Sequence, residues 1–210
     1  MGVSRREFLK MAAAAAASAA VNPLQAVIID DDLYINQRLG LAFRKPQGWH
    51  YVSIKSFKAL RDEYSLASHS EVLNEEMRDW TLPIVSVTKY PLDKRLGPSI
   101  VVYVERNALE ADESLLSVMP LIQAYQAGLF VDYAREGNYR AGRISGCESV
   151  EYFSRFVYER RSQPAVPVRN RSLCSVRDPV MYTMQMMDIP EQDMTAQHEF
   201  DAFVSSIIYI

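Results

Sequence analysis

The chain has 210 residues, a formal charge of -3 and 49% hydrophobic residues, which is the composition of one ordinary globular domain. A chain of this length buries roughly 70% of its unfolded surface, so its stability requires neither a metal nor a disulfide. Because an acidic chain lacks the many phosphate-facing cations that nucleic-acid binding requires, nucleic acid is not expected as a partner.

The first residues combine a positively charged start with an alanine-rich stretch from Met11 to Val21. The start resembles the twin-arginine (Tat) export signal at each of its defining positions, which are Ser4, Arg5, Arg6, Phe8, Leu9 and Lys10. The apolar stretch is shorter than the ~20 residues that span a bilayer, so no permanent membrane anchor is expected. The alternative is an amphipathic helix with two incidental arginines, but the alanine run has no polar face at helical spacing.

We therefore expect residues 1–26 to be a Tat signal peptide and short linker, with cleavage after Ala20 or Ala26. Residues 27–210 are then a single domain that reaches the periplasm already folded. The Tat translocase is the partner that this hypothesis implies during export.

The first half of that domain alternates short apolar runs with turn residues. Strands are predicted near 39–44 and 49–53, on either side of Pro46-Gln47-Gly48. The charged segment 56–80 favours one or two helices. The β-branched runs 84–90 and 99–106 predict a pair of antiparallel strands.

The second half has clearer periodicity. A helix is expected within 112–129, beginning near Ser117 so that Pro120 lies in its first turn. Loop residues at 162–167 and 177–179 then divide a long β region into a three-stranded meander. Apolar residues at helical spacing predict a final helix that buries one stripe: Phe200, Phe203, Val204, Ile207 and Ile208.

Several short motifs resemble the Mog1/PsbP-like family: Tyr34-Ile35-Asn36, Gly40-Leu41-Ala42-Phe43 and Pro46-Gln47-Gly48-Trp49, together with Phe200, Phe203, Val204, Ser205, Ser206 and Ile207 of the last helix. The resemblance extends over about residues 33–210. It implies an α+β (α/β) fold in which an antiparallel sheet is sandwiched between helices. Members of the family mostly bind or assemble other proteins, and no functional residue of the family can be matched to this chain.

The residues that carry chemistry are sparse. The three histidines, His50, His69 and His198, are too widely spaced for a metal motif. The chain has neither a nucleophile elbow nor a glycine-rich phosphate loop. We therefore expect no catalytic, cofactor-binding or metal-binding residues. The expected function is that of a binding or accessory protein. The alternative is a cofactor- or metal-dependent periplasmic enzyme, since folded export is often used when a cofactor is inserted before transport.

The two cysteines, Cys147 and Cys174, could form a disulfide in an oxidising compartment. A hairpin centred near Pro164 would, however, place Cys174 opposite about Ser154, and the two cysteines would then point to opposite faces of the strands. Two buried thiols are the alternative.

Arginines are unusually frequent between residues 135 and 177 of this acidic chain. Four of them could form one cationic surface for an acidic protein partner or for lipid headgroups: Arg155, Arg169, Arg171 and Arg177. The alternative is a solvated sheet face on which nearby glutamates balance the arginines.

Overall fold

The computed structural model describes residues 27–30, 32–53, 56, 83–91, 96–107, 109–110, 112–160, 163–190 and 192–210. The expected signal peptide and its cleavage positions, Ala20 and Ala26, lie outside these residues. So do nearly all residues of the helices expected within 56–80.

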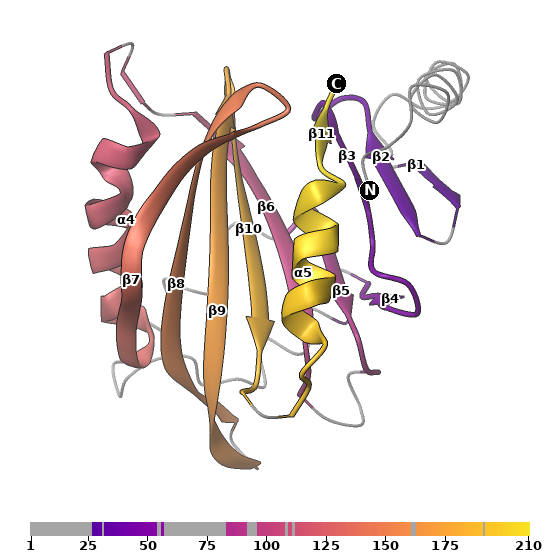
Figure 1. The fold of residues 1–210 in the computed structure, drawn as a ribbon, viewed down its shortest axis with the longest axis vertical. Coiled ribbons are helices and arrows are strands. Elements are labelled where there is room, and N and C mark those ends of the chain that lie inside the picture. The colour runs from indigo at the N-terminus through magenta and orange to yellow at the C-terminus, as the bar shows by residue number, and fades with distance from the viewer. Residues whose placement is uncertain are drawn as a thin grey trace.

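Two antiparallel sheets form the frame of the protein (Figure 1). The smaller sheet has the order β1-β2-β3-β11, with strands Val27–Asp30, Leu33–Asn36, Leu41–Arg44 and Ile208–Tyr209. The larger sheet has the order β4-β5-β6-β10-β9-β8-β7. Its strands, in chain order, are His50–Tyr51, Val85–Thr88, Ser99–Arg106, Val131–Ile144, Cys147–Arg160, Gln163–Arg177 and Val180–Asp188.

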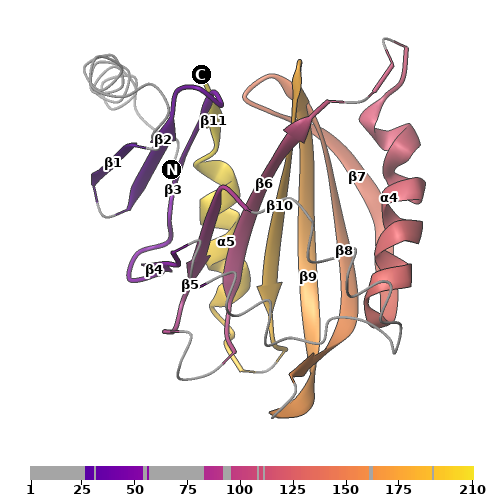
Figure 2. The same ribbon diagram turned by 180° about the vertical axis from the view of Figure 1, so that it is seen from behind.

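Two helices cover opposite faces of the larger sheet (Figure 2). Helix α5, Ala196–Ser205, packs Phe200 and Phe203 against β5, β6 and β10 in the main hydrophobic core. Helix α4, Leu115–Leu129, packs Leu115 and Met119 against the other face of β8 and β9. An antiparallel sheet between helices confirms the predicted fold class.

The predicted strand pairing is largely confirmed. Strands β5 and β6 pair as the runs 84–90 and 99–106 predicted, and β8, β9 and β10 form the meander. The loop expected at 162–167 is wrong, because β9 begins at Gln163 and keeps pairing through Val166 and Val168, which lie opposite Tyr158 and Phe156. Cross-strand apolar pairs outweigh the turn preference of the prolines here.

Both helices differ at one end from the prediction. Helix α4 begins at Leu115, not near Ser117, because the Ser114 side chain caps it by accepting a hydrogen bond from the Ser117 amide. Pro120 therefore lies inside the helix instead of in its first turn. Helix α5 ends at Ser205, and Ile208 belongs to β11, which pairs with β3.

Neither of these described helices is long and apolar enough to cross a bilayer.

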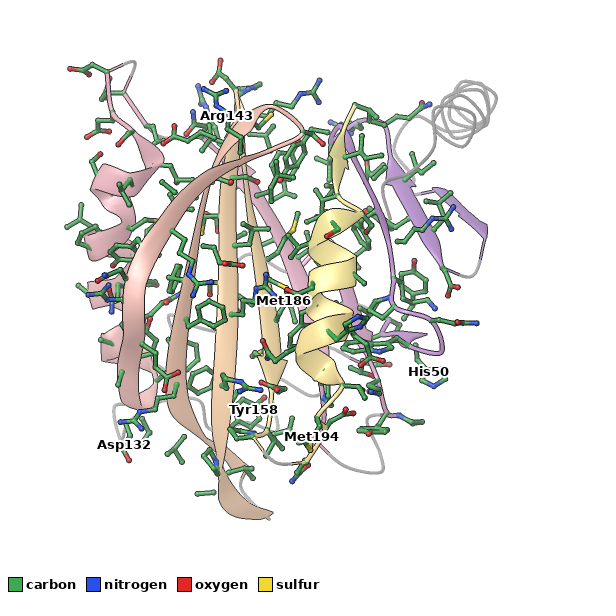
Figure 3. The ribbon with its side chains drawn as sticks, in the orientation of Figure 1. His50, Asp132, Arg143, Tyr158, Met186 and Met194 are labelled. Carbon is green, nitrogen blue, oxygen red and sulfur yellow. The ribbon has the colours of Figure 1, made fainter. Side chains whose placement is uncertain are left out.

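Helix α5 covers only part of its side of the sheet. The sheet residues that its core contacts belong to β5, β6 and β10, with Leu173 of β9 at the margin, and Met186 points toward the helix (Figure 3). No described helix lies over β7 and β8 on this side (Figure 1). The candidate site lies on this uncovered part of the sheet.

Candidate partner-binding surface

The side chains of this surface come from three neighbouring strands, β7, β8 and β9. Because successive residues of a strand point to opposite faces, Glu151, Phe153 and Arg155 of β8 share one face. Phe153 lies opposite Arg171 of β9, and Arg155 lies opposite Arg169. We define the arginine face by its four cations and the ring between them: Arg140, Phe153, Arg155, Arg169 and Arg171.

Arg171 ties the surface to α5. Its Nε donates to Glu151 Oε1 and its Nη1 donates to Asp201 Oδ1, both at 2.6 Å. The Arg171 side chain is 11% exposed, so its charge is largely neutralised by these two carboxylates instead of being offered to a partner. Its guanidinium carbon also lies 5.7 Å from the centre of the Phe153 ring.

Arg169 is bound in a similar way to a buried carboxylate. Its Nε and Nη2 donate to the two oxygens of Asp188 at 3.0 and 2.6 Å. The Asp188 side chain has 0% exposure, whereas that of Arg169 has 35%. This bidentate geometry fixes the guanidinium and leaves one edge of it toward solvent.

The accessible cations are Arg140 of β7 and Arg155 of β8. Their side chains are 70% and 69% exposed, and their ion pairs are long: 3.7 Å from Arg140 to Glu151 and 4.0 Å from Arg155 to Glu136. The Arg140 guanidinium carbon lies 5.2 Å from the centre of the half-buried Phe153 ring. The surface thus presents an aromatic ring beside two loosely paired guanidinium groups.

The structure brings together three of the four arginines that the sequence suggested. Arg155, Arg169 and Arg171 share the arginine face, but Arg177 lies at the far end of β9, where its Nη1 is 3.5 Å from the Gly40 carbonyl oxygen. Sequence reasoning did not place Arg140 or Phe153 on this surface. The alternation of β8 already places Phe153 between Glu151 and Arg155, whereas the position of Arg140 depends on an irregularity in β7 between Glu136 and Arg140.

The two cysteines are free and occupy different environments. Because Arg160 of β8 pairs with Gln163 of β9, Cys174 lies opposite Val150, and the expected placement opposite Ser154 is wrong. Cys174 is buried beneath α4 with Leu115, and burial raises the pKa of its thiol to about 11. Cys147 is half-buried at the start of β8 and, by strand alternation, on the opposite face. No disulfide joins them.

A second group of polar side chains is buried between α4 and the sheet. Gln126 Oε1 accepts hydrogen bonds of 2.9 Å from the hydroxyls of Tyr133 and Tyr152. Beside them, Asn170 Nδ2 donates to Ser154 Oγ at 3.2 Å and to Ser172 Oγ at 2.8 Å. The Gln126 bonds join the helix to the sheet, whereas the Asn170 bonds lie within the sheet and leave the buried Asn170 Oδ1 without a partner.

The histidines do not gather into a site. His50 of β4 and His198 of α5 are exposed on separate elements, and His69 lies outside the described residues. Among the residues that the structure describes, no group of three or more His, Cys, Asp or Glu side chains could hold a metal ion.

Comparison with known proteins gives a result at the level of fold. No family model matches the sequence, and a search of curated proteins found no match. The solved structures that resemble this one include cyanobacterial PsbP (CyanoP) from Synechocystis sp. PCC 6803, with a TM-score of 0.52 and 15% identity over 90% of this chain and 100% of that chain. They also include LpqN, involved in cell envelope biogenesis of Mycobacterium tuberculosis, with a TM-score of 0.46 and 11% identity over 80% of this chain and 82% of that chain. The likeness to CyanoP shows that this chain has a PsbP-like fold.

Proposed function

We propose that this chain is an exported accessory protein of the periplasm that binds a protein partner through the arginine face. The observation that carries the proposal is the pair of exposed side chains Arg140 and Arg155 beside the half-buried Phe153, on a part of the sheet that no described helix covers. Arginine and aromatic side chains supply most of the binding energy in protein interfaces, typically from a few positions. Export rests on the sequence pattern of residues 4–10.

The internal ion pairs give this surface a fixed shape before binding. Arg169 and Arg171 are held by Asp188, Glu151 and Asp201, which limits the side-chain entropy that a partner must remove. Arg140 and Arg155 carry the accessible positive charge of the surface. An acidic partner is therefore favoured, because its carboxylates can replace the long contacts to Glu151 and Glu136 with closer ones.

The double variant Arg140→Glu, Arg155→Glu tests this proposal. Both side chains are mostly exposed, so their reversal alters the surface without leaving a buried carboxylate unpaired. We expect cross-linking in the native periplasm, quantified by mass spectrometry, to recover the specific partner at least about tenfold less with this variant than with the wild type.

Arg38→Glu provides the matched control, since Arg38 is an exposed arginine between β2 and β3, on the smaller sheet. Its partner recovery should equal that of the wild type. Equal recovery by the double variant as well would refute the arginine face as the binding surface. Reversal at Arg169 and Arg171 is less informative, because it also breaks the contacts that hold β9 to β10 and α5.

A further inference from the structure

Strand β7 is the last strand of the larger sheet, and no strand among the described residues pairs with its long outer edge. It extends over Val131–Ile144, with Asp132 and Arg143 near its two ends (Figure 3), and within the described chain only β8 pairs with it. An edge strand turns every second pair of N–H and C=O groups away from the sheet, where another chain can bind them. The strand at the opposite edge, β4, has only 2 residues and offers almost no such edge.

An irregularity divides β7 and limits where another strand could pair. The register shifts between Glu136 and Arg140, and Gly137 has a φ of 70° there. Beyond that point, residues 140–144 pair one by one with 151–147 of β8. This segment is regular, and most of its side chains are exposed, so it is the part of the edge on which a further strand would fit.

The positive charge of residues 140–144 indicates that the polypeptide that binds there is acidic. Residues 140–144 contain Arg140 and Arg143 and no acidic residue, and both arginines are exposed. Arg155 adds a further exposed cation on the adjacent strand. An acidic polypeptide complements these charges. A second copy of this chain does not, because pairing of the two segments would place the arginines of both copies along one seam with no acidic residue in either segment.

We propose that the edge of β7 at Arg140–Ile144 binds an extended acidic segment of the partner as an additional strand. This inference rests on the proposed function, since it names how the partner engages the arginine face. Main-chain hydrogen bonds to β7 supply affinity that does not depend on sequence. Arg140 and Arg143 are three residues apart and therefore point to opposite faces of the sheet, so each selects a carboxylate on its own face of the added strand.

Synthetic peptides test the proposal directly. The probe is a capped ten-residue peptide of alternating Glu and Val. Two further peptides have the same sequence and carry backbone N-methyl groups on every second residue, one on the Glu residues and the other on the Val residues. Dissociation constants come from fluorescence anisotropy, and the binding position comes from amide chemical shifts of the labelled protein. Strand addition predicts that one N-methylated peptide binds at least about tenfold more weakly while the other binds within about twofold, because only one set of N–H groups faces β7.

Charge is tested with the same probe. Arg140→Glu, Arg143→Glu should weaken peptide binding at least about tenfold, whereas the control Arg38→Glu should leave it unchanged. A peptide of alternating Lys and Val should not bind. The amide shifts should be concentrated in 139–145.

Three results would overturn the inference. Equal binding by both N-methylated peptides would exclude strand addition, and no detectable binding of the unmethylated probe would exclude the edge as a site for acidic segments. Dimerisation in sedimentation experiments that is abolished by blocking this edge would identify a second copy as its occupant. The proposed function fails separately, only if Arg140→Glu, Arg155→Glu retains the native partner.

Discussion

Arg169 on β9 lies directly opposite Asp188 on β10, and its guanidinium donates hydrogen bonds of 3.0 and 2.6 Å to the two oxygens of that carboxylate. The Asp188 side chain has 0% exposure, so it depends on this arginine to offset the cost of burying a charge. The pair shows that an arginine in an arginine-rich segment can stabilise the fold by neutralising a buried carboxylate. It also explains why the accessible charge of the arginine face belongs to Arg140 and Arg155.

Removal of Arg169 should destabilise the fold through the carboxylate that it leaves behind. Arg169→Ala leaves the buried Asp188 carboxylate without its cation, and we expect a loss of about 2–4 kcal/mol in the free energy of unfolding. This loss is smaller than for a fully buried pair because Arg169 is partly exposed. Arg155→Ala, on the same face but mostly exposed, should change it by less than about 0.5 kcal/mol. Urea denaturation measures both. Equal stability of the two variants would contradict a structural role for the pair.

Asp193 should make the protein sensitive to acid. Burial by itself raises the pKa of Asp193, but hydrogen bonds from Lys89, Thr195 and Tyr90 outweigh burial and hold the pKa below its usual range. A carboxylate with a lowered folded-state pKa stabilises the fold fully above its unfolded pKa of about 3.9, and that contribution is lost as the pH falls toward the folded-state value. The wild type should therefore lose stability below about pH 5.

Asp193→Asn tests this linkage. The variant should be less stable at pH 7. Between pH 5 and pH 3 its unfolding free energy should fall less steeply with pH than that of the wild type, by the equivalent of up to about one bound proton. Urea denaturation across this pH range measures the slope. Asp112→Asn, at an exposed position before α4, is the control and should follow the wild type. An unchanged slope for Asp193→Asn would show that the Lys89 contact contributes nothing to acid sensitivity.

The hydrogen bonds between α4 and the sheet should matter more at Gln126 than at its neighbour along the helix. Gln126→Leu removes the acceptor of two tyrosine hydroxyls, those of Tyr133 and the fully buried Tyr152, and should cost about 1–3 kcal/mol in unfolding free energy. Gln123→Leu removes the acceptor of one half-buried hydroxyl, that of Tyr139, and should cost less. Thermal or urea unfolding of the two variants measures the difference. The reverse order would contradict this assignment.

The two thiols should differ in reactivity. Because the raised pKa of Cys174, about 11, keeps its thiol protonated at pH 8, it should react with Ellman's reagent only after denaturation. The half-buried Cys147 should react in the folded protein, and Cys147→Ser should abolish that reaction while Cys174→Ser preserves it. Intact mass measured without reductant should show both thiols. A mass lower by two hydrogens in protein from the periplasm would show instead that they form a disulfide.

Replacement of Arg5 and Arg6 by lysine should leave the precursor in the cytoplasm, because the Tat pathway reads the arginine pair as an address. Cell fractionation and immunoblotting measure the distribution of precursor and mature protein. Arg38→Lys, outside the expected signal, should be exported normally. Normal export of the lysine pair would refute the Tat hypothesis.

The sequence determined those features that depend on near neighbours in the chain. Strand alternation predicted the β5–β6 pair and the β8–β10 meander, and helical spacing predicted α5. These predictions succeed because the spacing of apolar residues within a short window indicates which of them are buried. The arginines of β8 and β9 could likewise be placed on one face. The twin-arginine pattern of residues 4–10 is also local, and export remains a prediction made from it.

Only the tertiary structure decided which of these arginines are accessible. Arg171 is neutralised by Glu151 on β8 and Asp201 on α5, and Arg140 reaches Phe153 only because β7 shifts its register before it. Such contacts depend on how distant strands and helices align, and a shift of one residue would turn a side chain to the opposite face. The charge of an arginine is thus fixed by the sequence, but its accessibility is fixed by the carboxylates that folding brings next to it.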